Sequence, residues 1–112
     1  MKYAIPLDGD KLSAHFGHCE KFAIFEFDLE KKEVIGKKFL TPPAHEPGIL
    51  PSWLADEGVD IVIAGGMGSR AQMLFKQNNI TVITGATENN PEQAVIKYIN
   101  NELKCGDNVC DH

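Results

Sequence analysis

Soft metal-binding side chains are concentrated in one short stretch of the chain, SAHFGHCEKF at residues 13–22. His15, His18 and Cys19 fall within five positions, and imidazole and thiolate are ligands that soft and borderline metal ions prefer. Gly17 gives the backbone the freedom to turn so that the three side chains converge. The stretch therefore predicts a metal or cofactor site. The alternative is a loop of solvated histidines beside a small buried cysteine.

A second group of donors lies at residues 104–112, KCGDNVCDH. Four residues separate Cys105 from Cys110, and His112 follows two positions later. Zinc ribbons usually place two residues between paired cysteines, so this spacing is a poor match to a standard zinc site. The group is either a further set of ligands or a chain end with incidental thiols. His45, in a proline-rich loop, becomes a candidate if that loop returns to the same sheet edge.

The stretch GGMGSRA at residues 65–71 joins a β-rich run to a helical one. Gly66 and Gly68 begin a G-x-G-x-x-A pattern, and backbone N–H groups at such a helix start favour an anion. Arg70 adds a positive charge. A dinucleotide site is disfavoured because the following strand ends in Thr-Gly rather than in a ribose-binding carboxylate. A structural turn is the default interpretation, and an anionic ligand is the second.

The pattern of apolar residues predicts the elements that hold these groups. Residues 2–7 alternate in polarity, as expected of a strand with one buried face. Residues 22–40 form two β-rich runs around a polar turn, as in an antiparallel hairpin. The two segments together predict a three-stranded antiparallel meander. Residues 41–53 contain four prolines and a glycine, which predict a loop.

Alternating helices and strands are predicted for the rest of the sequence. We expect a short helix through Leu50, Trp53 and Leu54 that ends at Gly58, followed by a buried strand at 59–66, a helix at 69–79, a buried strand at 80–85 and a helix at 89–103. In the last helix Asn90 is the expected N-cap, Pro91 suits the first turn, and Gln93 completes a capping box. Right-handed crossovers then extend the meander into one mixed five-stranded α/β sheet flanked by helices.

Length and composition predict one soluble domain over residues 1–103 and a Cys/His-containing tail over 104–112. The chain has 112 residues, of which 43% are hydrophobic and 24% charged. No apolar stretch approaches the ~20 residues that span a bilayer, and the first residues lack the apolar core of a secretory signal. We therefore expect a cytoplasmic protein with no membrane partner. Its three cysteines, an odd number, are expected to stay free in a reducing compartment.

The charge balance and residue types also argue against several functions. A net charge of −5 repels a phosphate backbone, so we expect no nucleic-acid partner, and the lysine pairs at 31–32 and 37–38 are expected to protect a sheet edge. A thiol nucleophile at Cys19 needs a base within hydrogen-bond reach, which neighbouring sequence positions do not establish. Asp8 and Asp10 lack the further acid that a two-metal nuclease needs. A thiol-dependent enzyme and a two-metal nuclease are therefore both disfavoured.

The longer motifs SAHFGHCEKFAIF, PPAHEPGILPSWLADEGVDIVIAGGMGSRAQMLF and ITVITGA, with the terminal CDH, are similar to a known family. Over essentially the whole chain the sequence resembles the dinitrogenase iron-molybdenum cofactor biosynthesis family, which includes NifX-like proteins and the C-terminal domain of NifB-like proteins. The combination of S-x-H-F-G with G-G-M-G-x-R-A at this separation is more specific than either motif alone. Cys19 and the CGDNVCDH tail look like features of small stand-alone members.

The resemblance implies a ribonuclease H-like fold and a nitrogen fixation-related role without catalysis. That role is the binding or carriage of a metal–sulfur cluster, either iron–molybdenum cofactor or an iron–sulfur precursor, in cofactor assembly or storage. Cluster-assembly or acceptor proteins are the implied partners. The candidate cofactor-binding residues are His15, Phe16, Gly17, His18, Cys19, His45, Gly66, Gly68 and Arg70, and the candidate metal ligands are His15, His18, Cys19, Cys105, Cys110 and His112. The alternative function is a small regulatory or interaction domain that binds a simple zinc ion or no metal.

Overall fold

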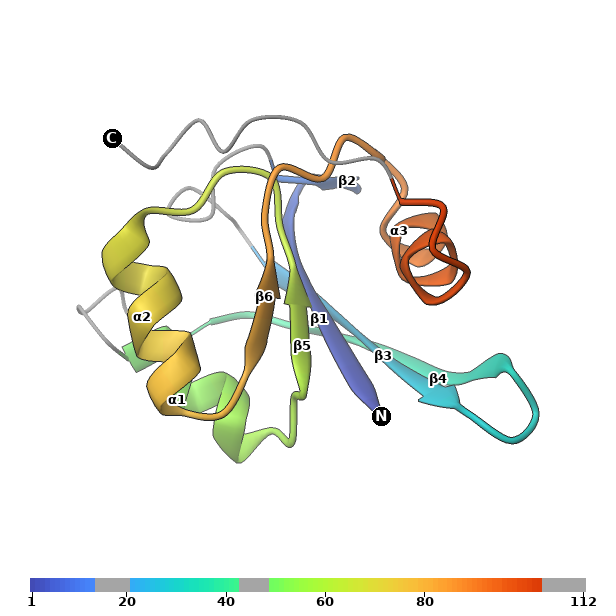
Figure 1. The fold of residues 1–112 in the computed structure, drawn as a ribbon, viewed down its shortest axis with the longest axis horizontal. Helices are drawn as coiled ribbons and strands as arrows, with labels where there is room; N and C mark the ends of the chain where they lie inside the picture. Colours follow the sequence, from blue (N-terminus) through green and yellow to red (C-terminus); the bar gives the residue numbers. More distant parts are fainter. Residues whose placement is uncertain (14–20, 43–48, 104–112) are drawn as a thin grey trace.

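A single mixed sheet forms the centre of the protein (Figure 1). The computed structural model describes residues 1–13, 21–42 and 49–103. Within these ranges the strands follow the order β4 (Glu33–Leu40), β3 (Lys21–Asp28), β1 (Lys2–Asp8), β5 (Ile61–Ile63) and β6 (Thr81–Ile83). A further two-residue strand, β2 (Lys11–Leu12), pairs with β1 outside this path. The predicted α/β class and five-stranded mixed sheet are therefore confirmed, with β2 as an addition.

The antiparallel half of the sheet consists of β1, β3 and β4, as the meander prediction requires. The β1–β3 ladder runs from the Lys2–Glu26 pair to the Leu7–Lys21 pair. The β3–β4 ladder starts at Phe22, opposite Leu40, and contains a bulge after Glu26. The turn between β3 and β4 is stabilised by Asp28. Its carboxylate accepts hydrogen bonds from the N–H groups of Glu30 at 2.8 Å and Lys31 at 3.1 Å, which favours a tight reversal of the chain.

In the described ranges, parallel strands and three helices make up the other half. β5 and β6 run parallel to β1, and the helices are α1 (Ile49–Asp56), α2 (Ser69–Gln77) and α3 (Pro91–Ile99). Every helix and strand predicted after residue 49 is present. β5, β6 and α3 are shorter than their apolar patterns suggested. The residues that flank them form hydrogen-bonded loops that belong to neither the sheet nor the helix.

The predicted helix ends are also present, but the predicted capping box is not formed, because the N–H of Asn90 donates to Oε1 of Glu88 at 3.1 Å instead of to the side chain of Gln93. The side chain of Asn90 accepts a hydrogen bond of 3.0 Å from the N–H of Gln93, and Pro91 is the first residue of α3. Gly58 follows α1 with a φ of +82°, a left-handed conformation that favours glycine, and its N–H donates to the carbonyl oxygen of Ala55 at 3.0 Å. Two local signals therefore set where these helices begin and end.

The two faces of the sheet bury separate apolar cores. α1 and α2 cover one face, with Leu54 and Phe75 fully buried against Phe22 of β3. α3 covers the other face, where Val95 and Ala94 pack against the side chains of β1 and β3 that point that way. Alternate residues of each central strand therefore supply opposite cores, as the two-residue period of a strand requires.

One prediction about β1 was wrong. The alternating pattern of residues 2–7 predicted one buried face, but Ala4 and Pro6 are as fully buried as Ile5. β1 lies between β3 and β5 in the middle of the sheet, so both of its faces are covered. Ala4 belongs to the core that α1 and α2 cover, and a small residue between larger ones resembles a polar face in the sequence.

Candidate metal-cluster site

The carboxyl ends of the parallel strands meet at one edge of the sheet. β1 and β5 are parallel, with Tyr3 opposite Ile61, and β5 and β6 are parallel, with Ile63 opposite Ile83. The loops that follow these strands therefore leave the sheet together. We call this side the carboxyl edge and define it by Asp8, residues 64–68 and residues 84–86. In sheets with parallel strands, ligands commonly bind at such an edge.

Strand register brings two further chain segments to the carboxyl edge. Lys21, the first residue of β3, lies opposite Leu7 near the end of β1. Leu40, the last residue of β4, lies opposite Phe22. The N–H of Ser13 donates to the carbonyl oxygen of Pro6 at 2.8 Å, so the chain beyond β2 starts from the same place. Ser13 and Lys21, which flank interval 14–20, and Leu40, which precedes interval 43–48, therefore all lie at the carboxyl edge.

The glycine-rich loop after β5 is packed and hydrogen-bonded. The N–H of Ala64 donates to the carbonyl oxygen of Ile83 at 2.8 Å, and the N–H of Ala86 donates to that of Ala64 at 3.1 Å. Met67 is fully buried, and its carbonyl oxygen accepts a hydrogen bond of 2.9 Å from Nε2 of Gln72. These bonds hold the loop in place, and both interpretations of it, a structural turn and an anion site, stay predictions. The loop also fixes where α2 begins.

Positive charge lies at the start of α2. Gly68 is the N-cap and has no side chain that could accept from the first N–H groups of the helix. Arg70, the second residue of α2, is exposed and makes no ion pair with any residue in the described part of the chain. Gly66 is buried within the loop. The helix start and the guanidinium together suit an anionic group at the carboxyl edge.

The soft donors themselves lie outside the described residues. This holds for His15, Phe16, Gly17, His18 and Cys19, for His45, and for Cys105, Cys110 and His112. All seven cysteines and histidines of the sequence fall in the three intervals 14–20, 43–48 and 104–112. The described ranges contain no group of three His, Cys, Asp or Glu side chains that could hold a metal ion.

Sequence inspection missed the residues that brace the carboxyl edge. Ser13 is buried, with only 2% of its surface exposed, at the point where the chain enters interval 14–20. Gln72 holds the loop carbonyl of Met67, and the backbone of Asn89 accepts from the N–H of Leu12 at 2.8 Å, tying the loop after β6 to β2. No spacing in the sequence indicated these roles, because each depends on contacts with a loop or strand that the fold brings close.

Comparison with known proteins identifies the family to which the chain belongs. The chain belongs to the family described as dinitrogenase iron-molybdenum cofactor, whose model matches residues 1–101. Among the described residues, no helix is long and apolar enough to cross a membrane.

Individual relatives share both sequence and fold. The chain is 38% identical over 92 residues to the uncharacterized protein MJ0580 of Methanocaldococcus jannaschii, a match that covers 78% of this chain and 76% of that protein. The crystal structure of PH0822 superposes with a TM-score of 0.85 at 30% identity, covering 94% of each chain. That of MJ0327, also from M. jannaschii, gives a TM-score of 0.74 at 25% identity and covers 96% of each chain.

Proposed function

We propose that this protein binds and carries a metal–sulfur cluster, of the iron–molybdenum cofactor type or an iron–sulfur precursor, without catalysing a reaction. Membership of the iron-molybdenum cofactor family supports the cargo class. The observation that carries the proposal for the site is the pairing of Lys21 with Leu7 and of Phe22 with Leu40. These pairs place the end of interval 14–20 and the approach to interval 43–48 at the carboxyl edge, next to the start of α2, where Arg70 lies.

Two of the proposed ligands are near residues of that edge in the sequence. His15 is two residues after Ser13, and Cys19 is two residues before Lys21. We propose His15, His18 and Cys19 as the main ligands, with His45 next. Cys105, Cys110 and His112 are proposed as additional ligands.

The remaining candidates would serve the anionic part of the cargo. Thiolate and imidazole bind the metal ions of a cluster, whereas sulfide and carboxylate groups around it need hydrogen-bond donors and positive charge. We propose that the N–H groups near Gly66 and Gly68 and the guanidinium of Arg70 supply these. Phe16 and Gly17 would shape the loop around the cluster. The two kinds of group are complementary, as an anionic metal–sulfur cluster requires.

Anaerobic reconstitution tests the proposal. Protein purified without oxygen is incubated with ferrous iron and sulfide, with and without molybdate, and examined by absorption spectroscopy and elemental analysis. We expect sulfide-dependent visible bands that are lost in the double variant His15→Ala, Cys19→Ser. Ser52→Ala, a change on the exposed face of α1, is the matched control and should retain the bands.

Two results would contradict the proposal. One is a preparation that takes up a single zinc ion and no sulfide-bound iron, which is the behaviour of a small zinc-binding regulatory domain. The other is a double variant that keeps the same bands and metal content as the parent protein. Protein isolated anaerobically from its own host gives the identity of the metal, because labile clusters are lost on handling in air.

A further inference from the structure

The edge strand β4 leaves a long backbone edge without a partner among the described residues. It has eight residues and, of the strands that the structure describes, pairs only with β3, whereas β6, at the other end of the sheet, has three residues. No described helix covers the outer side of β4 (Figure 1). Long free edges bind other strands unless they are protected, so the side chains around β4 decide what it accepts.

Exposed apolar side chains gather on this edge. Five large hydrophobic residues of the described chain have about half or more of their surface exposed. Three of them, Leu29 at 60%, Ile35 at 52% and Phe39 at 54%, belong to β4 or to the turn that leads into it. Single exposed apolar residues are ordinary, but a group along one strand marks an interaction surface.

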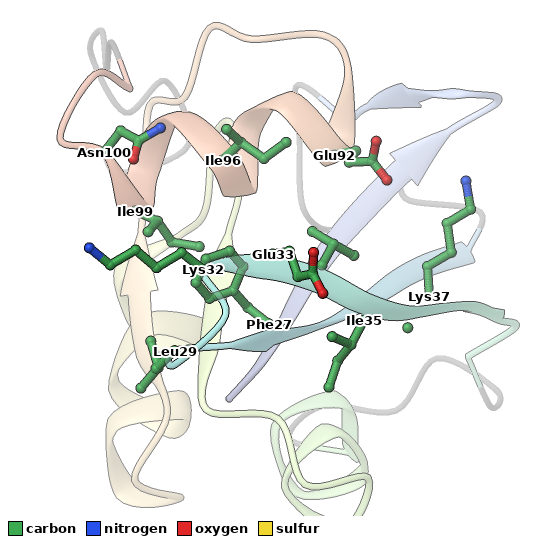
Figure 2. A pocket seen from close by; sticks show the side chains of 12 residues that line it. Phe27, Leu29, Lys32, Glu33, Ile35, Lys37, Glu92, Ile96, Ile99 and Asn100 are labelled. Carbon is green, nitrogen blue, oxygen red and sulfur yellow. The ribbon is translucent and has the colours of Figure 1, made fainter.

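A groove adjoins the same strand on the α3 face. It has a volume of about 750 Å³ and lies between the β3–β4 hairpin and α3. Figure 2 shows Ile96 and Ile99 of α3 on one side and Phe27 of the hairpin on the other, while the side chain of Ile35 extends from β4 away from α3. Lys32, Lys37, Glu33 and Glu92 also line the groove, so its charges balance. The groove offers an apolar floor beside an open strand edge.

The hairpin is basic although the protein is acidic. Residues 29–40 contain four lysines and two glutamates, an excess of two positive charges in a chain whose net charge is −5. Lys38 lies 3.8 Å from the carboxylate of Glu57, between its Nζ and Oε2. Lys31, Lys32 and Lys37 form no ion pair with any other residue in the described ranges. Three lysines and two glutamates, Glu30 and Glu33, therefore remain along the hairpin, an excess of one positive charge.

We infer that β4 and the adjoining groove, which we call the β4 surface, bind an extended acidic segment of another protein as an added strand. Backbone pairing with β4 would supply affinity, and apolar side chains would enter the groove. Carboxylates would pair with Lys31, Lys32 and Lys37. Lysines on an edge repel most strands, including the same basic hairpin of a second copy, but attract an acidic one. The inference does not depend on cluster binding.

A titration of the ¹⁵N-labelled protein with a capped peptide of four Glu-Val repeats tests this inference. We expect shifts of the backbone amides of β4 and of the groove residues of α3, and weakening of about tenfold when salt is raised from low to high concentration. The matching peptide of four Lys-Val repeats should bind at least about tenfold more weakly. No shift with the acidic peptide at millimolar concentration, or equal binding of both peptides, would overturn the inference.

Matched variants locate the binding surface. Ile35→Asp and Met73→Asp change residues of nearly equal exposure, 52% and 54%, on β4 and on α2. Lys37→Glu and Lys76→Glu make the same charge change on the same two elements. The β4 variants should weaken peptide binding about fivefold or more, and the α2 variants should leave it unchanged.

Two results would overturn the inference. Stronger effects in the α2 variants would place the peptide at β6, the strand beside Met73 and Lys76 of α2. A dimer in sedimentation that Ile35→Asp dissociates would show that a second copy occupies the edge.

Discussion

The ammonium Nζ of Lys97 lies 2.6 Å from Oε2 of Glu88, so α3 is held by its last turn to the loop that follows β6. The hydrogen bond from Lys97, followed by the one from the N–H of Asn90, lowers the pKa of the Glu88 carboxyl below its usual 4.5. The pair is partly exposed, so its contribution to folding is modest and screened by salt.

The Glu88–Lys97 pair predicts a defined pH dependence of stability. A carboxyl group whose pKa is lowered on folding stabilises the folded state above its unfolded pKa, and this contribution is lost as the pH falls through the folded value. We expect Glu88→Gln and Lys97→Met to lower the free energy of unfolding near pH 7 and to have little effect near pH 2, as measured by urea titration. An equal loss at both pH values would contradict this assignment.

Loss of the Asn90 cap should destabilise α3. Its side chain accepts from the N–H of Gln93 at 3.0 Å, and removal of such a bond costs about 1 kcal/mol. We therefore expect Asn90→Ala to lower the free energy of unfolding by about this amount, while Asn90→Asp keeps most of it. Asn89→Ala, one position earlier, is the control, because in the described part of the chain Asn89 is engaged through its backbone, by Leu12 and Glu88. Similar losses in Asn89→Ala and Asn90→Ala would argue against a capping role.

Two glycines should respond differently to alanine. Gly58 has a φ of +82°, whereas Gly36 in β4 lacks a positive φ, and a Cβ added there would lie 3.9 Å from the Cβ of Glu26. We expect Gly58→Ala to cost about 1 kcal/mol in the free energy of unfolding because the left-handed conformation is strained for alanine. Gly36→Ala should change it by less than about 0.5 kcal/mol or stabilise the protein slightly. Urea titration of both variants checks this, and equal effects would contradict it.

Local signals allowed much of the fold to be predicted. The cap at Asn90 and the helix end at Gly58 depend only on residues within one helical turn, and both are present. The burial of Ala4 and Pro6 was not predicted because it depends on the central position of β1, which is set by its pairing with β3 and β5. A short residue beside a larger one looks like a polar face until both neighbours of the strand are known.

The candidate site was likewise predictable only in part. Residue types alone singled out His15 and Cys19, because soft donors are rare and clustered. The shared edge could not be derived from the sequence, since it depends on the register that sets Lys21 opposite Leu7. The buried position of Ser13 likewise depends on its bond to the carbonyl of Pro6. The ligand role of the donors, in intervals 14–20, 43–48 and 104–112, stays a prediction.

Arg70→Glu should separate cluster binding from folding because the two respond with opposite sign. A negative side chain in the first turn of α2 interacts favourably with the helix dipole, so we expect the free energy of unfolding to rise by about 0.3–1 kcal/mol. The same change places a negative charge beside the proposed anionic cargo, so retention of a reconstituted cluster should fall. Urea titration and the absorbance of the cluster after gel filtration measure the two effects.

Lys76→Glu makes the same charge change in the last turn of α2, where the dipole has the opposite sign. It should lower the free energy of unfolding by about 0.3–1 kcal/mol and leave cluster retention unchanged. A general effect of net charge would weaken cluster retention equally in both variants, whereas a specific role of Arg70 weakens it only in Arg70→Glu. If Arg70→Glu retains the cluster as well as the parent protein does, the guanidinium takes no part in binding and only the thiolate and imidazole ligands of the proposal remain.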